Sequence, residues 1–472
     1  MTRTRRTTRR SAVAKMMGTS AATAALALML GGCAVGTGGS AGEDDADYNA
    51  DAELGGALSV MGFSGVDEVA TSRVELAEAE LGDVDVKLIE GDLDIQQFLS
   101  AVASGEPPEL LYADRDQIGS LAARGAILPL QRCIDGEGID MSQYRESAVD
   151  QVTLDGEVYG IPEFNQVQVT MANADLLKAA GVDLDDVNGS DREAMTAANR
   201  ALVKGGGGSL EVLGVDPKLP EFLPLWVAAS GGSLLSDDGR TASLDSQEAI
   251  DSLTWAVGMY DDQGGFSAVK AFRDSADFFG EGNQFTTNVL GAMPMEQWYL
   301  NVLNDVSPDA PMAFDTVRTT GGEPIAFAGG SAWAIPTGTE NSEAACRWAK
   351  AMTSVEAWRA AADARLALRE ADGKPFTGIL TGNTVADEEI EGMVTSGGEP
   401  WDSGVRVMYD ANEHTVSMAA NPADAEFEQA MQDAVNRVLN GDATPEDALA
   451  EAQATAQKAL DDGWQKLEDG TE

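Results

Sequence analysis

From Ala57 onward, stretches with hydrophobic residues at every second position alternate with stretches that have them at every third or fourth position. Within Val66–Leu81 the hydrophobic residues recur at helical spacing, whereas within Val84–Leu88 they alternate with polar residues, which predicts a β-strand. The same succession continues to Gly125, which we expect to follow the end of a third helix. A chain that alternates strand and helix in this way builds a mostly parallel sheet with helices on its faces, the α/β class.

Three of these predicted strands end beside residues suited to binding. Ligands of α/β proteins bind outside the carboxyl ends of the strands. In this chain those ends are followed by Phe63, by Glu90, and by Asp114, Arg115 and Asp116. Carboxylates and guanidinium groups form charge-assisted hydrogen bonds to hydroxyl groups, and these are stronger than neutral ones. We therefore expect a ligand site here, with hinge salt bridges or solvated loop residues as the alternative for each charged residue.

The next part of the chain predicts a hairpin followed by a bend. Asp155-Gly156 stands between two short hydrophobic runs and favours a tight hairpin turn. Pro162 then fixes one backbone angle and removes a hydrogen-bond donor, so the strand must stop or change direction there. The polar group Glu163-Phe164-Asn165 follows, before a second alternating run and a short helix.

Five motifs occur along the chain in a fixed order. The hairpin reads DGEVYGIP and leads through the bend to the helix LLKAAG. The others are FLSAVASGEPPELLYADRDQIGSLAARGAILPL at 98–130, GGSLLSDDGRTASLDSQEA within 222–265, FGEGNQFTTNVLGAMPMEQW at 279–298, and the run that begins GGSAWAIPTG at 329. In this order they resemble the motifs of solute-binding proteins of carbohydrate ABC transporters, the maltose-binding-like family, over nearly all of residues 55–465.

The resemblance implies a two-lobed periplasmic-binding-protein fold of type II. Each lobe is then a mainly parallel sheet flanked by helices, and the chain crosses between the lobes three times. Candidate crossings, where Gly or Pro stands beside hydrophobic residues, are 162–166, 327–330 and 375–379. The implied N-terminal lobe comprises residues 55–163 and 330–375, and the C-terminal lobe comprises residues 166–327 and 380–472.

Aromatic residues beside the crossings are candidates for contact with a sugar, because the C–H faces of a sugar lie flat on aromatic rings. Only 6% of the chain is aromatic, which makes those in predicted loops informative. Trp298 stands where the family has a sugar-stacking tryptophan, whereas Trp333 has core packing as its alternative. The complete set of expected ligand-binding residues is Phe63, Glu90, Asp114, Arg115, Asp116, Glu163, Phe164, Asn165, Glu296, Trp298, Gly330, Trp333 and Trp401.

Acidic residues outnumber basic ones by 79 to 31, which gives a formal net charge of −48. Nucleic acid is therefore excluded as a partner, because the phosphate backbone requires a basic surface. The acidity favours a solvated surface that keeps an exported protein soluble, and a cationic ligand is the alternative.

Composition also restricts catalytic and metal sites. His414 is the only histidine, so Ser-His-Asp, Cys-His and multi-histidine metal sites are excluded. Asp114 and Glu163 are the best placed pair for glycoside hydrolysis, but such pairs can always be chosen from 79 acids. Lys204 and the four glycines after it lack the closing residues of a phosphate loop. We expect a binding protein without catalytic residues, metal ion or cofactor.

The first 40 residues have the pattern of a bacterial export signal. Basic residues precede any acid, and the hydrophobic run at 21–30 is too short to span a bilayer but suits the core of a signal peptide. The run ends in Leu-Gly-Gly-Cys33, which resembles the lipobox in which the cysteine is acylated. We expect a signal peptide at 1–32, a lipid on Cys33 and a flexible tether at 33–54, with Sec or twin-arginine export both open.

The two other cysteines, Cys133 and Cys346, form an even pair in an exported protein, where a disulfide is permitted. Two buried free thiols are the alternative.

Together these patterns predict extracytoplasmic capture of a mono- or oligosaccharide by closure of the lobes about a hinge. The resemblance implies an ABC permease and its ATPase as partners, attachment to the outer face of the cell membrane through Cys33, and a monomeric protein. Three alternatives stay open: a sensor that presents its ligand to a membrane receptor, a binding protein for a cationic compound or peptide, and an enzyme acting on oligosaccharides.

Overall fold

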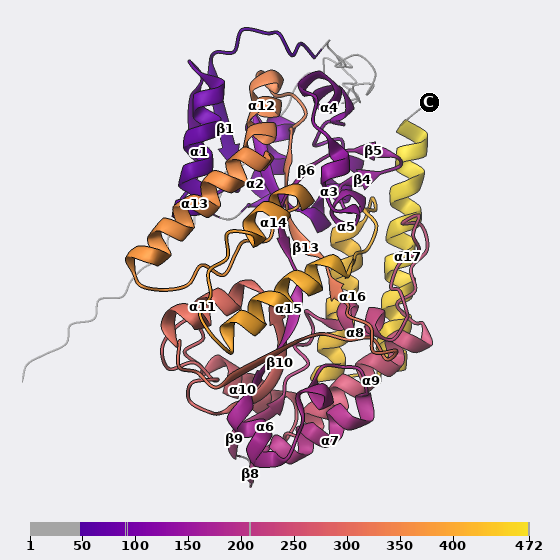
Figure 1. Ribbon diagram of the computed structural model, residues 1–472. Coiled ribbons are helices and arrows are strands. Elements are labelled where there is room, and N and C mark those ends of the chain that lie inside the picture. The colour runs from indigo at the N-terminus through magenta and orange to yellow at the C-terminus, as the bar shows by residue number, and fades with distance from the viewer. Residues whose placement is uncertain (1–47, 90, 92, 207–208, 471–472) are drawn as a thin grey trace, which may run out of the picture. The chain divides into compact units, whose positions relative to one another are not determined.

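The computed structural model describes residues 48–89, 91, 93–206 and 209–470 (Figure 1). All of them belong to one compact unit, which extends from Ala41 to Glu472 and contains two five-stranded sheets. No helix within these described ranges is long and hydrophobic enough to cross a membrane. The expected signal peptide and the lipid attachment at Cys33 lie outside the described residues.

The first sheet has the strand order β2-β1-β3-β13-β6. Its strands are β1 (Ala57–Met61), β2 (Asp85–Ile89), β3 (Leu110–Asp114), β6 (Ile161–Gln166) and β13 (Gly329–Ala334). β1 pairs in parallel with β2 and with β3, as the alternation of strands and helices predicts. β13 instead lies antiparallel to both β3 and β6.

The second sheet has the order β11-β7-β10-β9-β8. Its strands are β7 (Gln168–Asn173), β8 (Lys204–Gly206), β9 (Ser209–Val215), β10 (Leu290–Glu296) and β11 (Met312–Thr316). Only β10 and β9 pair in parallel, and the other three pairings are antiparallel. The two-lobed α/β class is confirmed, but the expectation of mainly parallel sheets is wrong. Strands that enter a sheet from the other lobe, β7 and β13, run opposite to their neighbours.

The predicted hairpin is present and consists of β4 (Thr153–Leu154) and β5 (Glu157–Val158). Asp155 and Gly156 have φ values of 51° and 83°, so both central residues adopt the left-handed conformation that a type I′ turn requires. A second small sheet pairs β12 (Ala326–Phe327) in parallel with β14 (Thr415–Val416).

The helices beside the first sheet come from two separate parts of the chain. α1 packs against α12 and α13, α4 against α12, and α14 against α13. α1 begins where the Asp67 carboxylate accepts the backbone N–H of Ala70 at 2.8 Å, an N-cap that satisfies one free donor of the first turn. The helices are α1 (Glu68–Leu81), α2 (Ile95–Ser104), α3 (Ile118–Ala123), α4 (Gln131–Glu137), α5 (Glu146–Asp150), α12 (Ser342–Thr353), α13 (Val355–Ala371) and α14 (Thr384–Glu391), with the 3-10 helices η1 (Arg115–Gln117) and η2 (Met141–Gln143).

The second sheet is covered by helices from the middle of the chain and by one later helix. α7 and α10 pack against β9, and α15 packs against β11 and β7. Every residue of β7 is buried, although Gln168, Thr170 and Asn173 are polar. The helices are α6 (Ala174–Ala180), α7 (Arg192–Leu202), α8 (Leu223–Ala229), α9 (Gln247–Asp261), α10 (Phe266–Asp274), α11 (Trp298–Val306) and α15 (Trp401–Glu413), with η3 (Leu184–Val187).

The chain passes between the sheets at three places. The first passage lies between β6 and β7, and the second between β11 and β13, close to the predicted positions. Before the third passage, residues 380–383 run beside β6, where the Gly382 N–H donates to the Glu163 carbonyl at 2.5 Å. α14 then packs on α13, whereas α15 packs on the second sheet. The third passage therefore lies at residues 392–400, and its predicted position at 375–379 is wrong.

The physical reason is a hydrophobic cluster that sequence periodicity does not reveal. Phe376 and Ile379, which lie within the predicted crossing, pack with Trp358 of α13 and Ile390 of α14. This contact keeps the segment beside the first sheet until α14 ends.

The last two helices, α16 (Asp424–Leu439) and α17 (Pro445–Gly470), pack along each other and are the yellow pair in Figure 1. α16 contacts α3 and η1, which follow the first sheet, and also α9 beside the second. The face of α16 that carries Phe427, Met431 and Val435 is buried.

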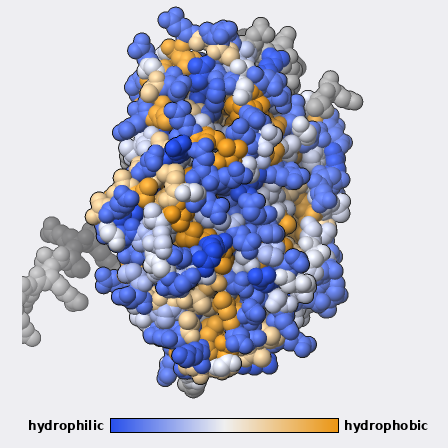
Figure 2. Space-filling model, in the orientation of Figure 1, coloured by the Kyte–Doolittle hydropathy of each residue, from blue (hydrophilic) through white to orange (hydrophobic). Residues whose placement is uncertain are grey.

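A disulfide joins Cys133 of α4 to Cys346 of α12, with 5.8 Å between the two Cα atoms. The face of the molecule in Figure 2 is largely hydrophilic, in keeping with the acidic composition.

Candidate functional site

A cavity of about 320 Å³ lies where elements of the two sheets meet. Its first wall is formed by the end of β3, by η1 and by the start of α16. The second lobe contributes residues 220–222, 224 and 225 and the end of β10. Residues 166, 168 and 327–330 beside the crossings line the part that we call the floor. The cavity thus touches both lobes and the segments that join them, which is the geometry that a ligand needs to hold two lobes closed.

Five of the expected ligand residues line this cavity, and they are Asp114, Arg115, Asp116, Glu296 and Gly330. Asp114 ends β3 and Glu296 ends β10, so strand ends carry these side chains into the cavity, as the rule for α/β sheets predicts.

Gly330 has a structural requirement for glycine. Its φ of 139° is a backbone conformation that other residues rarely adopt. A Cβ atom added there would also collide with the carbonyl oxygen of Phe164 and with the guanidinium of Arg115.

Arg115 is completely buried beneath the floor of the cavity. Its guanidinium donates to the side-chain oxygens of Gln151 at 2.9 Å and Asn165 at 2.7 Å, and to the backbone carbonyls of Phe164 and Gly329 at 2.8 and 2.5 Å. Gln151 directly follows α5, whereas the other partners belong to β6 and β13. Arg115 therefore links the two strands at the crossing, and its N–H groups donate to protein atoms.

Three other expected ligand residues lie in or beside the core of the first sheet. Phe63 and Trp333 are buried and pack with Tyr112, with ring centroids 5.1 Å apart for the pair Phe63–Trp333. Glu163 is buried in an ion pair with Arg73 and also accepts the Tyr112 hydroxyl at 2.6 Å. None of the three lines the cavity, because their aromatic and charged partners are Tyr112 of β3, Trp348 of α12 and Arg73 of α1.

Four of the remaining candidates also lie away from the cavity lining. Trp298 packs on α11 with Phe279, stacked at 6.2 Å between ring centroids. Trp401 is buried and donates its indole N–H to the Pro308 carbonyl at 3.0 Å. Phe164 packs against the Trp358 cluster, and Asn165 is buried in the hinge. Glu90 lies outside the described residues.

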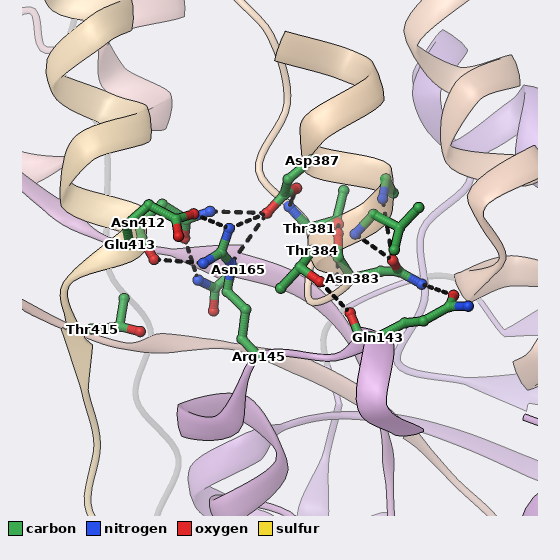
Figure 3. Close-up of polar contacts among 12 residues, drawn as sticks. Gln143, Arg145, Asn165, Thr381, Asn383, Thr384, Asp387, Asn412, Glu413 and Thr415 are labelled. Atoms are coloured by element: carbon green, nitrogen blue, oxygen red, sulfur yellow. Dashed lines mark hydrogen bonds and ion pairs between the residues drawn. The ribbon is translucent and has the colours of Figure 1, made fainter. Parts of the chain in front are cut away.

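The hinge contains a buried polar network that connects segments from four parts of the chain (Figure 3). Asn165 of β6 donates to the Asn412 Oδ1 of α15 at 2.6 Å, and Asn412 donates to Asp387 of α14 at 2.9 Å. Arg145, just before α5, donates to the same Asp387 oxygen at 2.9 Å and to the Asn412 carbonyl at 2.8 Å. Since Asn165 also holds Arg115, one series of hydrogen bonds leads from the cavity floor through two of the crossing regions.

Carboxylates in the cavity repel one another. Asp116 is exposed at the cavity, and partial desolvation by the surrounding protein raises its pKa to about 7, with further contributions from Glu428 and Asp114. Burial also raises the pKa of Asp424 well above its ordinary value, although backbone hydrogen bonds from Asn421 and Ser120 oppose the shift. The pKa of Glu296 is raised by burial as well.

Several lining residues were not predicted from the sequence. The amides of Gln151, Gln166 and Gln168 line the floor, while Phe222, Phe327 and Phe427 supply the rings. Of these residues, only Gln166 and Gln168 could have been predicted from the sequence, since they flank the first crossing. α16 contributes Asp424, Glu428 and Gln432, which lie at the polar border of its buried face.

The fold and the cavity together define a two-lobed binding protein. Residues 73–366 match the model of the bacterial extracellular solute-binding protein family, and the chain belongs to this family.

Two curated relatives are similar to part of the chain. One is the maltooligosaccharide ABC transporter solute-binding lipoprotein of Streptococcus pneumoniae, 24% identical over 269 residues, which are 54% of this chain and 57% of the relative. The other is the maltodextrin-binding protein MdxE of Bacillus subtilis, 25% identical over 283 residues, 56% of this chain and 62% of the relative. The similarity thus spans a little over half the length of these relatives.

Solved structures share the fold. CpMnBP1 with mannotriose bound has a TM-score of 0.67 at 22% identity, with 85% of this chain and 99% of that chain covered. The maltose/maltodextrin-binding domain MalE from Bdellovibrio bacteriovorus, bound to maltotriose, has a TM-score of 0.62 at 18% identity, with 86% and 100% covered. At these identities the likeness is evidence for the fold alone.

Proposed function

We propose that this protein captures a carbohydrate outside the cytoplasm, in the cavity between its two sheets, and delivers it to an ABC importer. The observation that carries the proposal is the cavity itself, which is lined by both lobes and by the crossing segments. Amide side chains such as Gln166 and Gln168 suit the hydroxyl groups of a sugar, and the rings of Phe222 and Phe327 suit its C–H faces. The names of the relatives, which refer to maltooligosaccharide and maltodextrin, support a carbohydrate ligand.

Closure follows from this geometry. We propose that the two lobes rotate about residues 166–168, 317–328 and 392–400. A ligand that contacts both walls only in the closed form binds that form more tightly, and it shifts the population by this difference in affinity. The permease of an importer then recognises the closed form.

We further propose that the protein binds without catalysis. The cavity lining, as far as the described residues form it, contains no serine, threonine, cysteine, histidine or lysine, so the only candidates for acid–base or nucleophilic chemistry are carboxylates. The resemblance of Cys33 and its preceding residues to a lipobox supports anchoring to the outer face of the membrane by lipid.

The test is a thermal-shift screen of residues 41–472, the compact unit that contains the whole cavity, against neutral and aminated mono- and oligosaccharides. A ligand that binds only the folded protein must raise the melting temperature. We expect a shift with at least one saccharide, lost in the double variant Gln166→Ala with Phe327→Ala. The shift should survive Trp298→Ala, because Trp298 does not line the cavity. If no saccharide shifts the transition, the carbohydrate proposal is wrong.

A second candidate function, capture of a cationic solute that is not a sugar, is favoured by one observation. Six of the cavity-lining residues are acidic and one is basic.

A further inference from the structure

A second cavity of about 280 Å³ lies beside the first. It is lined by the first residues of α2, by η1 and α3, and by α16. Asp116, Glu428 and Gln432 line both cavities, so they mark the place where the two spaces meet. A ligand longer than the first cavity would pass these three side chains.

Carboxylates outnumber basic side chains around this junction. The acidic residues that line the first cavity are Asp114, Asp116, Glu221, Glu296, Asp424 and Glu428. The basic residue of the first cavity is Arg115, whose guanidinium already donates to Gln151, Asn165 and two backbone carbonyls. The basic residue of the second cavity is Arg124, which forms an ion pair with Glu426 at 2.9 Å. Among the ion pairs between described residues, none includes Asp116 or Glu428, so these two carboxylates have no cationic partner there. The negative charges of Glu428, Asp114 and Asp424 act on Asp116, and the positive charge of Arg115 opposes them.

The second cavity adds one acceptor that has no donor. The Gln117 Oε1 atom is buried and has no hydrogen-bond partner within the described part of the chain. Gln117 lines the second cavity next to Asp116. A buried acceptor without a donor costs free energy, so a ligand that donates hydrogen bonds there is favoured.

We propose that the ligand of this cavity is a saccharide that carries a positively charged amino group, which pairs with Asp116 and Glu428 at the junction of the two cavities. This inference rests on the proposed function, because it assigns the ligand chemistry of the same site. Closing the lobes around a neutral sugar would remove water from these carboxylates without supplying a counter-charge, and such desolvation is unfavourable. An ammonium group supplies the counter-charge and several N–H donors, and its hydrogen bonds to carboxylates are stronger than those of a hydroxyl group.

The experiment compares matched ligands by isothermal titration calorimetry with residues 41–472. The probes are the di- and trisaccharides of glucosamine, the same compounds after N-acetylation, neutral maltotriose and mannotriose, and spermidine. We expect the aminated saccharide to bind at least about tenfold more tightly than its N-acetylated form. Its affinity should fall as salt rises from 0.05 to about 0.5 M, because added ions screen the attraction.

Two double variants test whether Asp116 and Glu428 cause the preference for an aminated saccharide. Asp116→Asn with Glu428→Gln removes both carboxylates and nearly preserves side-chain shape, so affinity for the aminated saccharide should fall at least about tenfold while affinity for neutral saccharides is kept. The matched control is Asp461→Asn with Glu446→Gln, which removes the same two charges from exposed positions of α17 that line neither cavity. Melting temperatures without ligand show whether each variant is folded.

The outcomes separate this inference from the proposed function. If neutral saccharides bind as tightly as aminated ones, the amino-group inference is wrong and the carbohydrate function stands. If spermidine binds and no saccharide does, the carbohydrate function is wrong, and so is an aminated saccharide as the ligand. If the cavity variant and the control variant lose the same affinity for the aminated saccharide, the general acidity of the chain causes the preference for amino groups. That result also overturns the inference. Absence of binding to every probe contradicts both proposals.

Discussion

Replacement of Glu163 by glutamine distinguishes most sharply between the role that the sequence predicts and the role that the structure indicates. The sequence places Glu163 at the first crossing as a ligand contact. In the structure its carboxylate is 1% exposed, pairs with Arg73, which is 4% exposed, and accepts the Tyr112 hydroxyl. The Arg73 guanidinium lies 3.9 Å from the centroid of the Trp358 ring, so the pair also connects α1 to α13.

The expected loss of stability follows from the burial of this ion pair. Glu163→Gln leaves the Arg73 charge buried with backbone carbonyls and an aromatic face as its only partners, and breaking a buried pair in this way costs about 3–5 kcal/mol. The double variant Glu163→Gln with Arg73→Met removes both charges and should cost less than the sum of the single changes. Urea unfolding followed by tryptophan fluorescence measures these free energies from the transition midpoints at constant slope.

The control is a solvent-exposed pair of the same type. Arg406 and Glu399 are each 64% exposed and 3.0 Å apart, so Glu399→Gln should cost about 0–1 kcal/mol. If Glu163→Gln costs no more than this control and instead weakens saccharide binding about tenfold, Glu163 is a ligand residue and the structural interpretation is refuted.

Three further predictions follow. Reduction of the Cys133–Cys346 disulfide, which closes a loop of 213 residues, should lower the free energy of unfolding by up to about 5 kcal/mol in the loop-entropy description; urea curves with and without reductant that coincide would contradict this. Gly330→Ala should destabilise the fold by about 2–4 kcal/mol, because its Cβ collides with the carbonyl oxygen of Phe164 in a backbone conformation that suits glycine; a melting temperature equal to that of wild type would contradict it. The pKa of Asp116 is about 7 in the folded chain and about 3.9 in the unfolded chain, so the folded state keeps the proton to higher pH. The stability that protonated Asp116 contributes therefore declines as pH rises from about 4 to about 7. Asp116→Asn should therefore raise the melting temperature relative to wild type more at pH 8 than at pH 4, and an equal difference at both pH values would exclude the shift.

Local sequence patterns were sufficient to predict the helices and strands and part of the candidate site. Helical and strand spacing between Ala57 and Gly125 predicted the order β1 to α3, and Asp155-Gly156 predicted the β4–β5 turn, because spacing and turn preference act over a few residues. Asp114, Arg115 and Asp116 were found for a similar reason. The carboxyl end of a strand in an α/β sheet lies at the binding edge whatever the remainder of the fold.

Only the tertiary structure decided which side chains face the cavity. Phe63, Trp333 and Trp401 are aromatic residues near predicted loops, yet each is buried by partners distant in sequence, such as Tyr112 for Trp333 and Pro308 for Trp401. The third passage between the lobes was misplaced because Phe376 and Ile379 pack on Trp358.

The same reason explains the residues that were missed. Glu428 and Gln432 reach the junction of the two cavities only because α16, close to the end of the chain, packs against η1 and α3 near its beginning. Periodicity identifies the buried face of such a helix, but the partner that its polar border meets depends on contacts across about 300 residues. The sequence therefore specified the elements, the fold class and the strand-end carboxylates, while the packing of distant segments specified the lining of the cavity.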